Sequence, residues 1–179
     1  MNQQVPPMQI TLETQLVHNL TRWRQLLADR ELTRLPHRIE TDRLGRIIMT
    51  PPPFFEHVWR ISRIIELLHE YLPTGKTLSE TPISTADGVK VMDVAWLESD
   101  YAKALEQQRP LILERAPQIC IEVLSESNSP EEMAEKRALY FEAGAREVWI
   151  CELDGRMSFY CGGALIGNSE ICSRFPKQL

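Results

Sequence analysis

Two acidic residues stand inside apolar runs of strand length. Asp93 lies near the start of residues 92–97, and Glu122 lies near the end of residues 118–125. An ionised carboxylate in an apolar strand is costly to desolvate unless it is paired or bound to a metal. A cation shared by the two acids is the simplest common explanation. Strand-end capping or pairing with arginines is the alternative, and the pattern alone leaves both open.

The chemistry that such a carboxylate pair supports is phosphoryl hydrolysis. Hard cations such as magnesium prefer carboxylate oxygen and keep some waters for a substrate phosphate. A metal held there can polarise a phosphoryl oxygen and help to form a hydroxide nucleophile. The pair therefore predicts a metal site formed by Asp93 and Glu122 at the ends of neighbouring strands.

Helices that could position these acids follow from the spacing of apolar residues. One helix is expected over residues 11–31 and a second ends at Pro73. The third has a strong start, because Ser129 can cap it and Pro130 suits its first position, and it closes on Gly144. The apolar stripes of the first two helices are Leu12, Leu16, Leu20, Trp23 and Leu27, and Val58, Ile61, Ile65, Leu68 and Leu72.

Strands are expected between and after these helices. Their predicted ranges are 46–49, 76–85, 89–97, 118–124, 146–152, 156–161 and a short one at 171–175. Residues 98–116 read as a polar, partly helical excursion. The order of elements predicts an α/β fold with a mixed sheet flanked by helices, in a single domain over residues 1–179.

Composition and charge narrow the classes of protein. The chain is 43% hydrophobic and 25% charged, and its net charge of −5 argues against a non-specific nucleic-acid binder with a basic footprint. No apolar run approaches the ~20 residues that cross a bilayer, and residues 1–7 lack the features of a secretory signal. The four cysteines form no C-x-x-C pair. We therefore expect a reduced, cytoplasmic protein without a membrane partner.

The order of several short motifs resembles a known family. Asp93 is followed by Glu122-Val-Leu-Ser, by Lys136-Arg and Tyr140, and by the segment at residues 142–150, Glu-Ala-Gly-Ala-Arg-Glu-Val-Trp-Ile. This order is similar to that of the putative restriction endonuclease family of uncharacterised bacterial proteins, in the PD-(D/E)XK nuclease superfamily. The resemblance spans about residues 30–160. It also includes residues 38–40 (Arg-Ile-Glu), residues 45–49 and His57.

The resemblance implies a restriction-endonuclease-like core and assigns roles to site residues. Asp93 matches the acid of the PD element and Glu122 that of the (D/E)XK element, although Met92 replaces the proline and Leu124 the usual lysine. In this family the lysine looks to have moved to the next helix, where Lys136 matches it. Lys136 would stabilise the charge on the scissile phosphate. Glu40 would be a further acid, with a salt bridge to a neighbouring arginine as its alternative, and His57 is a secondary candidate.

The resemblance also implies an activity, a cofactor and a substrate. The expected activity is endonucleolytic hydrolysis of phosphodiester bonds, with Mg²⁺ as cofactor and Mn²⁺ as the alternative ion. The expected partner is nucleic acid, with DNA favoured. Such folds often act as homodimers because two sites are needed to cut two strands. The competing hypothesis is a catalytically inactive nuclease-fold module for nucleic-acid binding or protein interaction.

Overall fold

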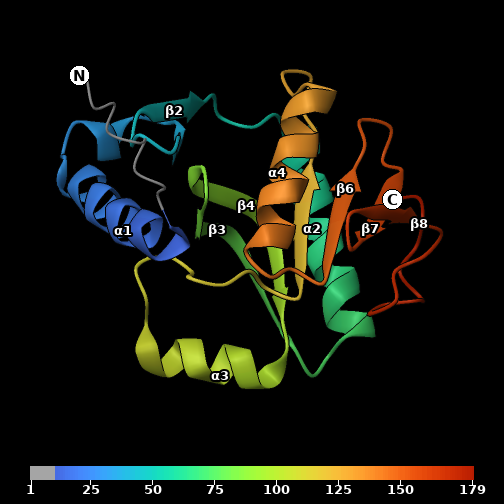
Figure 1. Ribbon diagram of the computed structural model, residues 1–179. Coiled ribbons are helices and arrows are strands. Elements are labelled where there is room, and N and C mark those ends of the chain that lie inside the picture. Colours follow the sequence, from blue (N-terminus) through green and yellow to red (C-terminus); the bar gives the residue numbers. More distant parts are fainter. Residues whose placement is uncertain (1–10) are drawn as a thin grey trace, which may run out of the picture.

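The centre of the molecule is a six-stranded mixed sheet with helices on both faces (Figure 1). The computed structural model describes residues 11–179, so residues 1–7, where no secretory signal is expected, lie outside it. The elements in chain order are α1 (Leu12–Ala28), the 3-10 turn η1 (Leu32–Arg34), β1 (Arg38–Thr41), β2 (Ile47–Thr50), α2 (Phe55–Tyr71), β3 (Lys76–Thr85), β4 (Gly88–Leu97), α3 (Ser99–Gln108), β5 (Ile119–Val123), α4 (Pro130–Glu142), β6 (Glu147–Cys151), β7 (Met157–Cys161) and β8 (Ala164–Ile166).

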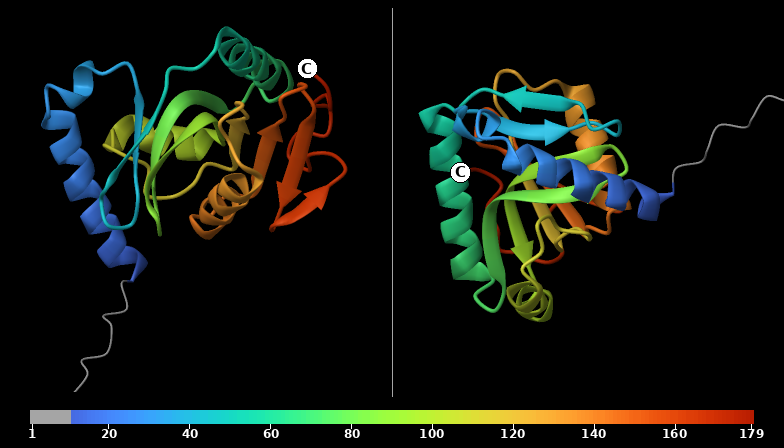
Figure 2. Two further views of the ribbon diagram at one scale, coloured as in Figure 1. Left: turned by 90° about the horizontal axis from the view of Figure 1, so that it is seen from above. Right: turned by 90° about the vertical axis from the view of Figure 1, so that its left-hand side faces the viewer.

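The sheet has the order β3-β4-β5-β6-β7-β8, and only β5 and β6 run parallel to each other. A parallel pair needs a crossover connection, and α4 provides it. Figure 2 shows α2 on one face of the sheet and α4 on the other, with α1 beyond the β3 edge. The expected fold class, a mixed sheet flanked by helices, is therefore confirmed.

Apolar side chains pack on both faces of the central strands. On the α2 face, Ile64, Leu67 and Leu68 bury against the sheet. On the α4 face, Ala95 and Cys120 pack against Tyr140. These two layers hold β4 and β5 between them, which explains why all the residues of both strands are buried. Asp93 and Glu122 are therefore buried by the layers on either side of their strands.

The buried face of α1 differs from the predicted apolar stripe. Leu12 and Leu27 are exposed, whereas Gln15 and Asn19 are buried. The cause is the β3–β4 turn, whose carbonyl groups need donors: the Asn19 side-chain amide donates to the oxygens of residues 85 and 88, at 3.0 and 3.1 Å. Packing on a polar turn has thus overridden the sequence pattern.

The strands differ from the prediction in two places. Residues 38–41 form a strand that was not predicted, β1, ahead of the predicted strand at 46–49, which forms as β2. The last strand is β8, at Ala164–Ile166, and residues 171–175 form none. Residues 169–172 are instead bonded through side chains: Glu147 accepts hydrogen bonds from the backbone amides of Glu170 and Ile171, at 2.7 and 2.9 Å. Such side-chain contacts leave no periodic pattern in the sequence from which they could have been predicted.

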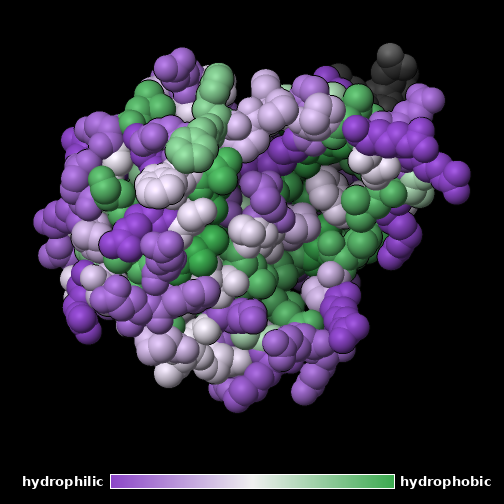
Figure 3. Space-filling view, turned by 180° about the vertical axis from the view of Figure 1, so that it is seen from behind, coloured by the Kyte–Doolittle hydropathy of each residue, from purple (hydrophilic) through white to green (hydrophobic). Residues whose placement is uncertain are grey.

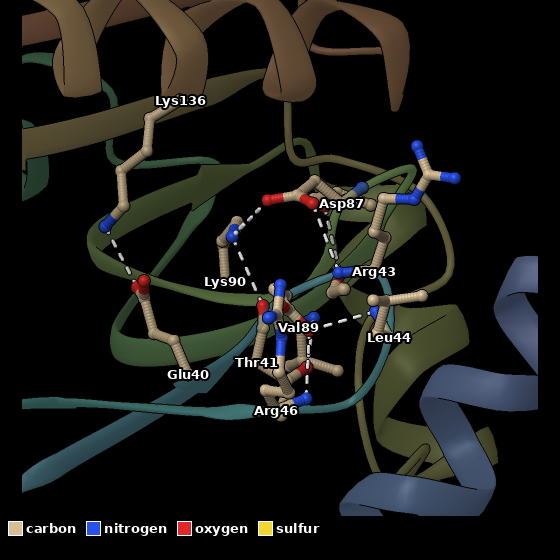
Figure 4. Close-up of polar contacts among 12 residues, drawn as sticks. Glu40, Thr41, Arg43, Leu44, Arg46, Asp87, Val89, Lys90 and Lys136 are labelled. Atoms are coloured by element: carbon tan, nitrogen blue, oxygen red, sulfur yellow. Dashed lines mark hydrogen bonds and ion pairs between the residues drawn. The ribbon is translucent and has the colours of Figure 1, made fainter.

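The hairpin of β1 and β2 lies against β4 and is fastened to it by polar contacts (Figure 4). Thr41 accepts a hydrogen bond through its hydroxyl from the Val89 amide at 2.9 Å. Lys90 donates to the Thr41 carbonyl at 3.2 Å and to Asp87 at 2.9 Å. Asp87 in turn accepts from the Arg43 amide at 3.1 Å. These bonds fix the position of the preceding residue of β1, Glu40.

No helix in the described part of the chain is both long enough and apolar enough to cross a membrane.

Candidate active site

Three buried carboxylates come together from three strands. Glu40 is supplied by β1, Asp93 by β4 and Glu122 by β5. Their side chains are between 1% and 6% exposed. Lys136 on α4 joins them, although it is far away in the sequence. The structure thus brings Glu40, Glu122 and Lys136 into contact, while Asp93 lies near enough for its charge to raise the pKa of Glu122.

Asp93 lies where strands β4 and β5 separate. The backbones of the two strands pair from Trp96–Ile119 to Val94–Ile121 and then separate. At this point the side chain of Asp93 replaces the backbone pairing. One of its oxygens accepts a hydrogen bond from the Val123 backbone amide at 2.7 Å. The other forms an ion pair with Arg38 and lies 3.5 Å from Nε2 of His57. Asp93 therefore bonds across the gap between the strands.

Lys136 lies between the other two carboxylates. Its Nζ is 2.9 Å from Oε1 of Glu40 and 3.4 Å from Oε2 of Glu122. Figure 4 shows Lys136 extending from α4 toward Glu40 on the β1 strand. The hydroxyl of Tyr140, one helical turn after Lys136, donates to Oε1 of Glu122 at 2.5 Å. Glu40 thus pairs with Lys136, and the expected alternative, a salt bridge to a neighbouring arginine, is not what forms.

Burial and neighbouring charges set the protonation of the site. Burial raises the pKa of Glu122 to about 7; Lys136 lowers this pKa, and Asp93 raises it. Burial also acts to raise the pKa of Asp93, but the hydrogen bond from His57 and the charge of Arg38 outweigh it and leave that pKa below its ordinary value. Burial would lower the pKa of Lys136, but Glu122 and Glu40 raise it. Lys136 therefore stays charged near neutral pH, while Glu122 titrates there.

A cleft of about 790 Å³ opens beside this cluster. Arg38, His57, Glu80 and Glu122 contribute to its wall, while Asp93 lies fully buried behind them. Two buried nitrogens next to the cleft, Nε of Arg38 and Nδ1 of His57, have no hydrogen-bond partner among residues 11–179. The Nε–H of Arg38 is a donor, and a buried donor without a partner is costly, so this group is suited to an incoming acceptor. A phosphate oxygen is such an acceptor.

Glu80 is a residue of this wall that the sequence analysis missed. It lies on β3, where the register moves from Ser79–Val94 to Thr81–Met92, and it has a positive φ of 47°. This backbone conformation is uncommon for a residue with a side chain, and such outliers occur often at functional sites. Its carboxylate lies 3.8 Å from Nη1 of Arg38, and burial raises its pKa. No turn residue in the sequence signals this local distortion.

The donor chemistry of the site fits a hard divalent cation. Magnesium needs only one or two protein carboxylates beside water and substrate phosphate, and Asp93 and Glu122 could supply these. Burial is the main cause of the raised pKa of Glu122, and a bound cation would favour the ionised form of this carboxyl group. Among residues 11–179, however, no group of three or more His, Cys, Asp or Glu side chains has metal-site geometry. Arg38 is also paired with one oxygen of Asp93, so a cation that used this oxygen would have to displace Arg38.

Comparison with known proteins adds a family and a structural relative. Residues 14–161 match the model of the family Uma2, described as "Putative restriction endonuclease". The crystal structure of a putative nuclease belonging to DUF820 from Anabaena variabilis ATCC 29413 superposes with a TM-score of 0.64 and 17% sequence identity. The match covers 79% of this chain and 86% of that chain, and at this identity it shows a shared fold alone. No curated protein matches the chain.

Proposed function

The chain belongs to the putative restriction endonuclease family Uma2, and from this premise we propose that it is a magnesium-dependent endonuclease. Its reaction would be hydrolysis of phosphodiester bonds in nucleic acid, with DNA as the first substrate to test. The observation that supports the proposal is a buried charged cluster beside a cleft. Lys136 contacts Glu40 and Glu122, Glu122 reaches the cleft wall, and the charge of Asp93 acts on Glu122. Burying charged side chains lowers the stability of the folded protein, and such clusters occur often at functional sites, where the charges take part in binding or catalysis.

Asp93 and Glu122 would hold the metal. A bound magnesium ion supplies positive charge that stabilises the phosphoryl oxygens during hydrolysis. The carboxylates prepare for it differently. Asp93 is kept ionised by Arg38 and His57, whereas Glu122, with a pKa of about 7, must lose its proton when a cation binds. Metal binding should therefore release protons and strengthen with pH between about 6 and 8.

Lys136 would stabilise the charge on the scissile phosphate. An ammonium group has three N–H donors, and two of them are directed to Glu40 and Glu122. The third remains for a phosphate oxygen. Glu40 would be a positioning residue, since it accepts a hydrogen bond from Lys136 and is itself fixed by a hydrogen bond from the Val91 amide at 2.9 Å. Manganese would substitute for magnesium because it prefers the same oxygen ligands.

Arg38 and His57 would bind the phosphodiester backbone in the cleft. Within residues 11–179 the buried Nε–H of Arg38 has no acceptor, whereas Nδ1 of His57, whose Nε2 faces Asp93, could donate to a phosphate oxygen only in the doubly protonated ring. Release of Arg38 from Asp93 by the metal would free its guanidinium for a phosphate oxygen, which it can contact through two parallel N–H groups. This exchange would couple the arrival of the metal to the binding of the substrate.

Nicking of supercoiled plasmid tests the proposal. Wild-type protein should nick in the presence of Mg²⁺ or Mn²⁺ and lose this activity in EDTA. Asp93→Asn, Glu122→Gln and Lys136→Met should each reduce the rate by at least about a hundredfold, given the size of charge-stabilisation effects in catalysis. Lys103→Met is the matched control, since Lys103 is 72% exposed on α3 and should leave the rate unchanged.

The alternative is a nuclease-fold module that binds without cutting. The ion pair between Arg38 and Asp93 is the observation that favours it, because the arginine already balances the charge of that acid. Metal binding that is absent in calorimetry, together with nucleic-acid binding that survives Asp93→Asn, would establish the module. Metal binding and nicking that are both lost in Asp93→Asn would establish the enzyme.

A further inference from the structure

The first turns of α2 and the residue before the helix expose an apolar surface. Phe54 is 75% exposed, Phe55 76%, Trp59 62% and Val58 45%, and we call these four residues the α2 aromatic patch. The rings of Phe55 and Trp59 lie 5.9 Å apart. Figure 3, which looks onto the face of the molecule that carries α2, shows apolar side chains reaching the surface among polar ones. The later turns of α2 pack on the sheet, so the sheet leaves this patch uncovered.

We propose that a second copy of this chain covers the α2 aromatic patch, with the two α2 helices packed antiparallel across a two-fold axis. This homodimer is independent of the proposed catalytic activity. In a two-fold interface the same surface of both subunits meets itself, so the patch must be complementary to itself. Its area, its lack of charge and the order of charges beside it meet this requirement.

The area of the patch fits the core of a protein interface. Aromatic side chains bury about 150–250 Å² each, so the three rings at their observed exposure present about 300–500 Å². An exposed apolar patch of about this size is often functional. A standard interface buries about 800 Å² of each partner, with an apolar core inside a polar rim. The patch therefore supplies the core, and neighbouring polar residues of α2 would supply the rim.

The charge of the patch favours a protein over a nucleic acid. Single-stranded nucleic acids stack on aromatic side chains that stand beside a positively charged groove. Residues 47–59 contain no lysine or arginine, and their one acidic residue is Glu56. The next arginines along the helix are already paired, Arg60 with Glu56 at 3.0 Å and Arg63 with Glu66 at 3.1 Å. The patch thus lacks the free positive charge that a phosphate backbone needs.

The order of charges on α2 fits an antiparallel pair. Glu56 and Arg63 are seven residues apart, hence on one face of the helix, with Trp59 between them. They are 65% and 50% exposed. With a two-fold axis near Trp59, antiparallel pairing places Glu56 opposite Arg63 of the partner subunit, and the reverse pair forms at the other end. In the dimer Glu56 and Arg63 would therefore exchange their present partners on α2, Arg60 and Glu66, for each other. Both charge pairs then flank a central cluster of aromatic rings.

The proposed dimer would also affect the cleft. Phe54 belongs to the patch and to the wall of the cleft, together with the three prolines at residues 51–53. A second copy on the patch would therefore stand at the mouth of each cleft. Dimerisation would narrow the entrance and bring the two candidate active sites to either side of one interface.

Sedimentation velocity over protein concentrations of about 1–100 µM tests the proposal, a range in which interfaces of modest area dissociate. Wild-type protein should change from monomer to dimer within it, and Trp59→Lys should remain a monomer. Leu165→Lys is the matched control: Leu165 is 66% exposed on β8, outside the patch, and its variant should dimerise like the wild type. Circular dichroism checks that each variant is folded.

Charge reversal tests the antiparallel arrangement. Glu56→Arg and Arg63→Glu alone should each weaken the dimer by about tenfold, which corresponds to about 1.4 kcal/mol. The double variant should recover the wild-type affinity. A wild-type protein that stays monomeric at the highest concentration, an equal loss with Leu165→Lys, or a double variant without recovery would each overturn the proposal.

Tryptophan fluorescence gives an independent measurement. Of the four tryptophans only Trp59 is exposed, since the others are at most 7% exposed. Quenching of its fluorescence by acrylamide should decrease as the protein concentration rises. If thymidine oligonucleotide protects Trp59 in a protein that remains monomeric, the patch binds bases instead, and the homodimer proposal is wrong.

Discussion

Glu122→Gln tests the electrostatics of the site while it preserves the shape of the side chain. The carboxyl group of Glu122 has a pKa of about 7 in the folded protein, against an ordinary value of 4.5, because it is buried beside Asp93 and Glu40. The folded protein therefore holds a proton between pH 4.5 and 7 that the unfolded chain has released. The free energy of unfolding must therefore fall as the pH rises through this window, because the folded state binds more protons there than the unfolded state.

The size of the effect follows from the width of the window. Between pH 4.5 and 7 the free energy of unfolding falls by about 1.4 kcal/mol for each pH unit. The ionisation of Glu122 therefore lowers it by about 3 kcal/mol between pH 4.5 and pH 8. Glutamine cannot ionise and lacks this loss. Relative to wild type, Glu122→Gln should therefore gain about 3 kcal/mol over this range. The pKa of Asp93 is lowered, so its own effect falls below pH 4 and does not interfere.

Urea denaturation of the metal-free protein, followed by tryptophan fluorescence at several pH values, measures this difference. Glu135→Gln on the exposed side of α4 is the control and should show no pH-dependent difference from wild type. Saturating Mg²⁺ should flatten the wild-type profile, because a cation favours the ionised carboxylate. A difference between Glu122→Gln and wild type that stays constant from pH 4.5 to pH 8 would refute the reasoning.

Three further predictions concern single residues. Lys136→Met leaves two buried carboxylates without their cation, so it should lower the free energy of unfolding at pH 8 by about 3–5 kcal/mol. The control Lys103→Met should change it by less than about 0.5 kcal/mol, and equal effects of the two variants in urea titrations would contradict the buried ion pairs. Arg38→Met removes the side chain that competes for the carboxylate of β4, so calorimetry should show about tenfold tighter Mg²⁺ binding, and unchanged or weaker binding would argue against competition. Glu147→Gln disturbs an acceptor that binds the Trp149 indole at 2.6 Å and two backbone amides; it should destabilise the protein by about 2 kcal/mol, and wild-type stability would show that these bonds are dispensable.

Local patterns in the sequence predicted the central strands and the two acids in them. Asp93 and Glu122 stand out because each interrupts an apolar run, and desolvation makes such an interruption costly. The cap of α4 was equally readable: Ser129 accepts a hydrogen bond from the Glu132 amide at 3.1 Å, as its position before Pro130 predicted. These features depend on neighbours in the chain, which the sequence displays directly.

Long-range partners were not readable in the same way. Glu40 and Lys136 are 96 residues apart, and only the family resemblance placed both at one site. The ion pair of Arg38 with Asp93 and the positive φ of Glu80 depend on how β1 and β3 approach β4, which no local pattern encodes. The roles of the site residues and the single-domain organisation remain predictions.

The most direct test of the metal site is anomalous diffraction from crystals soaked in MnCl₂. The proposed function predicts an anomalous peak within about 2.0–2.3 Å of carboxylate oxygens of Asp93 and Glu122, with Arg38 moved away from Asp93. In crystals of Asp93→Asn the peak should be absent or strongly reduced. A wild-type crystal with no peak at this position, and with Arg38 still paired to Asp93, would contradict the proposed metal-dependent mechanism.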